Sequence, residues 1–89
     1  KMDGGRLEVL NTGNSIFMGE GAGLNDDLTD NRNVFIGDSA GYSNTTGFLN
    51  TATGAEAFLS NTTGNANVAN GFRALYKNTT GNGNTANGP

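Results

Sequence analysis

Histidine, cysteine and tryptophan are all absent from this 89-residue chain. The chain therefore cannot build a Ser-His or Cys-His nucleophile, a zinc site of imidazole or thiolate ligands, or a disulfide framework. We expect no enzymatic activity and no cofactor. Only five residues are basic, and the net charge is −3, which argues against binding to nucleic acid. No amphipathic helical stripe occurs, so we expect no helical fold, and we expect no insertion into a membrane.

Apolar residues are also scarce and make up 34% of the chain, whereas glycine and asparagine occur fifteen times each and threonine eleven times. This composition supplies too little apolar surface for a conventional core, and buried alanine contributes far less than buried leucine or phenylalanine. We therefore expect the chain to gain buried surface from copies of itself. Closed cyclic symmetry is the usual arrangement for such an assembly.

The chain does contain a glycine that recurs at a fixed interval. It stands at Gly19, Gly37, Gly54, Gly71 and Gly88, with spacings of 18, 17, 17 and 17 residues. A period in this range indicates a stack of equivalent units. Three residues after the glycine, every complete unit has an alanine, and the later units close with the phrase Asn-Thr-Thr-Gly, at 44–47, 61–64 and 78–81. In the first unit, Asp26–Asn31 replaces this phrase and accounts for the one-residue excess.

Each unit is predicted to contain a short strand before the recurring glycine. Val34–Ile36 and Thr51–Thr53 are β-branched or small, are flanked by Gly and Asn, and are too brief for a helix. We expect glycine at the recurring position and in the closing turn to supply positive φ, and asparagine to tolerate it. The sequence predicts an all-β fold, a parallel β-roll (β-solenoid) of about five 17-residue coils. Their predicted bounds are 15–32, 33–49, 50–66, 67–83 and a truncated 84–89.

Stacking these coils places equivalent residues directly above one another. The column of Ala22, Ala40, Ala57 and Ala74 must face a space too crowded for a larger side chain. The column of Asn33, Asn50, Asn67 and Asn84 is predicted to form a ladder, in which each amide bonds to the coils above and below. Residues 1–14 stand outside the repeat. Within them, a predicted strand over Arg6–Leu10 would cap the solenoid or connect it to a preceding part of a longer protein.

One acidic cluster is a candidate metal site. The carboxylates of Asp26, Asp27 and Asp30 would suit Ca²⁺, although acidic surface turns are usually only solvated and the spacing matches no known calcium loop. The asparagines that open the closing turns each begin an N-x-T sequon, which turn geometry explains equally well. These asparagines are Asn44, Asn61 and Asn78.

Aromatic residues provide a candidate ligand-binding surface. Tyr42, Phe72 and Tyr76, together with Arg73, are of the types that stack on and hydrogen-bond to sugars, and Phe58 belongs to the same aromatic set. Alternatively, these large side chains pack between chains, one per coil. The paired threonines of the closing turns raise a further alternative, an ice-binding array. Adjacent threonines in an extended segment would, however, point to opposite faces.

The phrase at 67–75, Asn-Val-Ala-Asn-Gly-Phe-Arg-Ala-Leu, with its trailing Asn-Thr-Thr-Gly-Asn, resembles the repeats in the head domains of trimeric autotransporter adhesins. It is also similar to longer-period repeats in phage tail fibres and in the mosaic adhesive trimer fibres of predatory bacteria. The resemblance covers residues 14–89. It implies a left-handed β-roll and a homotrimer with three chains about a threefold axis.

The resemblance further implies an extracellular fibre on a bacterial surface or a phage virion. From it we expect a structural and adhesive segment that presents or forms a surface for a receptor or glycan. The alternative is a monomeric β-solenoid that binds sugar or ice, and concentration-dependent stability would separate the two.

Overall fold

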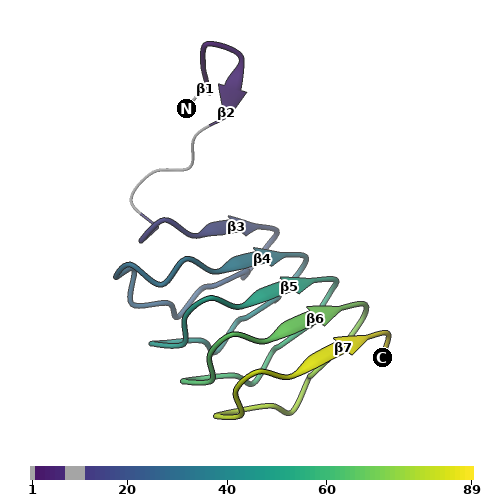
Figure 1. The fold of residues 1–89 in the computed structure, drawn as a ribbon. Coiled ribbons are helices and arrows are strands. Elements are labelled where there is room, and N and C mark those ends of the chain that lie inside the picture. Colours follow the sequence, from purple (N-terminus) through teal and green to yellow (C-terminus); the bar gives the residue numbers. More distant parts are fainter. Residues whose placement is uncertain (1, 8–11) are drawn as a thin grey trace.

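The computed structural model describes residues 2–7 and 12–89 and is all-β (Figure 1). Strands β1 (Met2–Asp3) and β2 (Arg6–Leu7) pair antiparallel. The strand expected over Arg6–Leu10 is thus β2 at its first two positions, and residues 8–10 lie outside the described residues. The remaining strands are β3 (Ile16–Met18), β4 (Val34–Ile36), β5 (Thr51–Thr53), β6 (Val68–Asn70) and β7 (Thr85–Asn87).

Strands β3 to β7 form one parallel sheet in sequence order, with one turn of the chain between each pair (Figure 1). The fold is therefore a β-solenoid of about four complete turns, which confirms the predicted repeat architecture. Its register follows the repeat, because Phe17 pairs with Phe35 and Phe35 with Ala52. The extra residue of the first unit lies in the turn before β4 and leaves this register intact.

The recurring glycine is required at the corner after each strand. Gly37 has φ of 131°, and a Cβ added to it would lie 2.6 Å from the carbonyl carbon of Gly54 in the next coil. No side chain fits between coils at this distance, and positive φ disfavours other residues there as well. The expectation for this position is confirmed.

One expectation about turn conformation is wrong. The closing-turn glycines Gly47, Gly64 and Gly81 are not in the positive-φ region; they are needed for space instead. A Cβ on Gly47 would lie 2.5 Å from the carbonyl oxygen of Gly64. Conversely, the left-handed corner before each strand is held mostly by residues other than glycine. They are Asn14, Arg32, Leu49 and Ala66, with φ of 55° to 59°, followed by Gly83.

Hydrogen bonds between coils explain why these corners tolerate side chains. The backbone N–H of Leu49 donates to the carbonyl of Asn31 at 2.8 Å, and that of Ala66 donates to Phe48 at 3.0 Å. A left-handed residue other than glycine costs about 1–2 kcal/mol, and such strain persists where the surrounding structure fixes the conformation. Hydrogen bonds between stacked coils therefore override the preference of these residues for negative φ.

Two columns of asparagine run along the solenoid, and both are buried in the middle coils. In the predicted column, the side-chain oxygen of Asn33 accepts the backbone N–H of Asn50 at 2.9 Å, and its amide donates to the Gly47 carbonyl at 2.8 Å. The repeated side chain to side chain ladder instead lies in the closing-turn column. There Asn61 donates to the oxygen of Asn44 at 2.8 Å, and Asn78 donates to Asn61 at 3.0 Å.

The interior of the solenoid contains one large apolar side chain per coil, surrounded by alanines. In the first two coils this side chain comes from the strand, as Phe17 and Phe35. In the next two it comes from the facing wall, as Phe58 and Leu75. The rings of Phe35 and Phe58 are 6.2 Å apart, and those of Phe17 and Phe35 are 5.7 Å apart and stacked. The interior is thus a single file of apolar groups.

Each large residue is matched by a small one across the coil. Phe35 faces Gly41, where an added Cβ would lie 2.5 Å from the phenylalanine ring. One coil later the sizes are exchanged, because Ala52 occupies the strand position and Phe58 occupies the position equivalent to Gly41. Phe58, expected with the surface aromatics, is 1% exposed, so that expectation is wrong.

This exchange predicts a rescue between two substitutions. Phe35→Ala alone should destabilise the fold by about 3–5 kcal/mol because it leaves a cavity, and Gly41→Phe alone should overfill the coil. The double variant reproduces the third coil and should recover most of the loss, less about 1–2 kcal/mol for the left-handed backbone at 41. Urea unfolding of the four proteins measures the coupling. Additive losses in the double variant would contradict it.

Candidate ligand-binding surface

Three of the four residues predicted to bind ligand come together on the wall that follows β6. The guanidinium carbon of Arg73 lies 4.9 Å from the centre of the Phe72 ring and 5.2 Å from that of Tyr76. Cations at such distances from aromatic faces are attracted by the ring quadrupole. Phe72 is 53% exposed, so the cluster faces solvent. We call Phe72, Arg73 and Tyr76 the arginine cluster.

Glu56 joins this cluster from the preceding coil. Its carboxylate accepts a hydrogen bond from Arg73 Nε at 2.7 Å, and this interaction raises the pKa of Arg73. The two residues are 17 positions apart and both have φ near 60°, so they occupy equivalent places in adjacent coils. Glu56 was not among the residues predicted to bind ligand, although its charge, opposite to that of Arg73 and one period away, is a sufficient signal.

Tyr42 lies apart from the arginine cluster. It belongs to the same column as Tyr76, but Leu59 stands between them, which separates the tyrosines by about 10 Å at the usual spacing of parallel strands. Its ring leans toward the first coil, where a Cβ on Gly21 would lie 3.3 Å from it. The predicted set of four aromatic and basic residues is therefore one cluster of three and one separate tyrosine.

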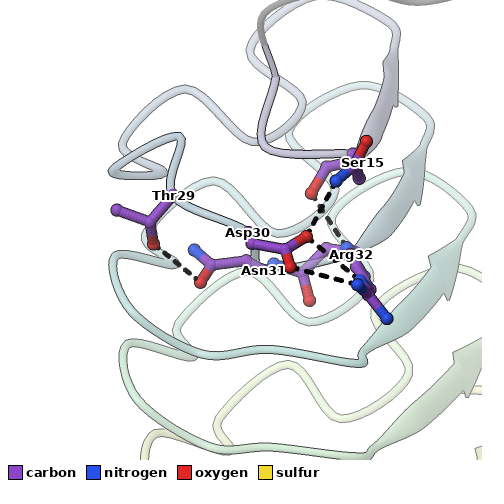
Figure 2. A network of polar contacts seen from close by, with 7 residues as sticks. Ser15, Thr29, Asp30, Asn31 and Arg32 are labelled. Atoms are coloured by element: carbon purple, nitrogen blue, oxygen red, sulfur yellow. Dashed lines mark hydrogen bonds and ion pairs between the residues drawn. The ribbon is translucent and has the colours of Figure 1, made fainter.

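The candidate calcium ligands Asp27 and Asp30 bind protein donors in the first closing turn. Figure 2 shows Asp30 beside Arg32. Thr29 donates to Asp27 through its backbone N–H at 3.1 Å and its hydroxyl at 2.8 Å, which together lower the pKa of Asp27. The Asp30 carboxylate accepts hydrogen bonds from Arg32 Nε at 3.0 Å and Nη2 at 3.1 Å, and also from the side-chain amide of Asn14. These bonds lower the pKa of Asp30, and the hydrogen bond from Arg32 has the largest effect.

Asp26 is buried and has a different role from its two neighbours. It occupies the position of Asn44 one coil earlier, and one of its oxygens accepts the side-chain amides of Asn33 and Asn44, both at 3.1 Å. Its other oxygen accepts the Leu28 N–H at 2.8 Å and the Asn31 amide at 3.2 Å. Asp26 therefore ends the asparagine ladder with a group that only accepts. Within 2–7 and 12–89, no cluster of three or more acidic residues could hold a metal ion.

The closing-turn asparagines are structural. Asn44 and Asn61 are completely buried and donate to the carbonyls of Gly47 and Gly64. Their amides are inaccessible to a glycosyltransferase in the folded chain, which favours turn geometry over glycosylation. The first threonine of a turn is also engaged, since the Thr45 hydroxyl donates to the Thr62 carbonyl at 3.1 Å.

Large apolar side chains are exposed on the outside of the solenoid. Those on β3 and β4 point away from the interior, where Ile16, Met18 and Ile36 are 39%, 51% and 38% exposed. We call these three residues the apolar strand face. No cavity or pocket is present in the described part of the chain, and none of its segments is a helix that could cross a membrane. A ligand would therefore bind on an open surface.

No protein-family model, no curated protein and no solved structure matches this chain.

Asp26→Asn should destabilise the fold by about 1–3 kcal/mol. Each carboxylate oxygen of Asp26 accepts from two donors, and the amide nitrogen that replaces one oxygen cannot accept either of its bonds. Asp27→Asn is the matched control and should cost less, since Asp27 is exposed and water can replace the lost bonds. Urea unfolding at neutral pH measures both. Equal losses in the two variants would show that Asp26 does not terminate the ladder.

Stability should also fall in acid. The carboxylates of Asp27 and Asp30 have lowered pKa values in the folded chain, so they stabilise it above the unfolded value of about 3.9. This contribution is lost as the pH falls through the lowered values. Thermal unfolding from about pH 5 to about pH 2 should give a flatter pH dependence for the double variant Asp27→Asn/Asp30→Asn. Asp38→Asn, whose carboxylate accepts only the Ser39 hydroxyl at 3.4 Å among the described residues, should keep the original slope.

Proposed function

We propose that this chain is a structural and adhesive segment of an extracellular trimeric fibre. Three copies pack as left-handed β-rolls about a threefold axis, with the apolar strand face between chains. The arginine cluster remains exposed and presents a surface to a receptor or glycan. The fibre belongs to a bacterial cell surface or a phage virion, in keeping with the repeats that the chain resembles.

The observation that carries this proposal is the distribution of large apolar side chains. The interior contains four of them, whereas nine are exposed on the described part of the chain. Three of the nine, Ile16, Met18 and Ile36, lie together on the apolar strand face. Exposed apolar groups that gather on one face mark interaction sites. A regular stack of coils suits a rod, because it presents the same backbone at every level.

Association through the apolar strand face also fits the polarity of the sheet. The outward positions of β3 and β4 are Ile, Met, Val and Ile, whereas those of β5 to β7 become Thr, Val and Asn. A partner chain on this face would therefore remove mainly the apolar side chains of β3 and β4 from water. About a threefold axis each copy meets its two neighbours through heterologous contacts, and one face turned toward the axis can supply both contacting patches and close the assembly.

The alternative is a monomeric β-solenoid that binds sugar or ice. The arginine cluster favours the sugar-binding form, because Glu56, Phe72, Arg73 and Tyr76 all belong to one chain. The ice-binding form has less support. Thr45 and Thr62 direct their hydroxyls to backbone carbonyls of the next coil, which leaves one exposed threonine in each of these two turns in place of a paired array.

The solution mass tests the proposal. Light scattering coupled to size-exclusion chromatography should give three times the chain mass of 9.1 kDa. The unfolding temperature should rise with protein concentration, because folding is coupled to assembly. Ile36→Asp should reduce the mass by placing a charge in the contact, and Thr63→Asp, in an exposed turn, is the matched control. A folded monomer with concentration-independent stability would contradict the trimer.

A further inference from the structure

We infer that the arginine cluster binds a saccharide ring that carries a carboxylate. This inference rests on the proposed function, since it names the ligand class of the proposed binding surface. The cluster combines an apolar ring face, a cation and an adjacent second ring within one coil. Aromatic faces suit the C–H faces of sugars, and a planar guanidinium suits a carboxylate.

The two arginines of the solenoid differ in how much of the guanidinium is occupied. Arg32 donates to both oxygens of Asp30, through Nε and Nη2, so its Nε–Nη2 edge is occupied and one of its two Nη atoms is already bonded. Arg73 donates to Glu56 through Nε, and no Nη atom of Arg73 has a hydrogen-bond partner among the described residues. Its Nη edge is thus available for a second carboxylate, and charge-assisted bonds of this kind are the stronger ones.

The rings position this edge. Phe72 and Tyr76 both contact the Arg73 guanidinium, and Glu56 fixes its Nε, so the side chain is held before a ligand arrives. Preorganisation lowers the entropy cost of binding. Phe72, at 53% exposed, leaves ring surface for the sugar beside the carboxylate.

The distribution of charge along the chain favours an anionic ligand at this place. Seven of the eight acidic residues precede position 39, and residues 1–38 carry a formal charge of −4 from three basic and seven acidic residues. Residues 39–89 carry +1, from Arg73, Lys77 and Glu56. An anion that approaches the fourth coil therefore meets a weakly positive surface, whereas the first two coils would repel it.

A neutral sugar is the weaker ligand for the arginine cluster. It could stack on Phe72, but it would leave the Nη edge of Arg73 bound only to water. The described part of the chain has no pocket that could surround a sugar and compensate for the missing charge. The carboxylate therefore supplies most of the discrimination, through a bidentate contact that a hydroxyl cannot reproduce.

Titration of the isotope-labelled 89-residue chain with methyl β-D-glucuronide, followed by amide chemical shifts, tests the inference. We expect saturable shifts around residues 72–76 with a Kd on the order of 1 mM, a magnitude suited to a monosaccharide. Methyl β-D-glucoside differs only at the carboxylate and should bind at least about tenfold more weakly. Equal affinity for the two sugars, or the absence of a saturable shift, would overturn the inference.

Variants locate the site. Arg73→Gln should weaken glucuronide binding at least about tenfold, and Phe72→Ala should weaken it roughly threefold to tenfold. Arg73→Lys keeps the charge but loses the planar fork, so it should also bind more weakly. Arg32→Gln is the matched control and should leave the affinity unchanged. Unchanged binding by both Arg73 variants would place the ligand elsewhere and refute the assignment.

Further outcomes identify the source of the anion, and others distinguish this inference from the proposed fibre. Tighter binding of methyl glucoside 6-sulfate than of the glucuronide, or binding of acetate as tight as that of the glucuronide, would overturn the assignment of a carboxylated sugar. A trimeric chain that fails to bind the glucuronide would refute this inference and leave the fibre intact. A monomeric chain that binds it would support the inference and refute the fibre.

Discussion

The spacing between coils is the constraint on which the rest of the structure depends. Successive backbones are so close at the recurring glycine that even a Cβ on Gly37 would collide with Gly54. At this spacing every side chain lies directly over its counterpart, so each position of the repeat must be compatible with a column of itself. Glycine, alanine and asparagine meet that requirement through small size or through amide bonding, which accounts for their abundance.

Inside the coils, the same spacing limits the core to a narrow file. One large apolar group fits per coil, and it enters from the strand or from the facing wall, as the pairs Phe35 with Gly41 and Ala52 with Phe58 demonstrate. Total volume is thus kept while its source changes, as expected of cores that tolerate volume-conserving exchanges. A core of this size stabilises a single chain only modestly, which is the physical basis for expecting assembly.

Most of the fold could be predicted from the sequence, because the repeat reports the register directly. The strands, the alanine columns and the glycine corner follow from residues that recur at one period. Other features do not recur as single residue types. The left-handed backbone of Leu49 and Ala66 is imposed by bonds between coils, and the burial of Phe58 depends on its small partner across the coil. The cluster around Arg73 was only partly predictable, since Glu56 is its neighbour through stacking and not through sequence proximity.

The asparagine ladder has a direction, because each side-chain amide donates toward the first coil and the series ends at Asp26. Every coil between the ends both donates one bond and accepts one. Duplication or deletion of a whole 17-residue unit after Asp26 would therefore leave no amide unmatched. The solenoid can therefore gain or lose whole coils through recombination between repeats in its gene. The fold and the Asp26 end of the ladder would stay the same.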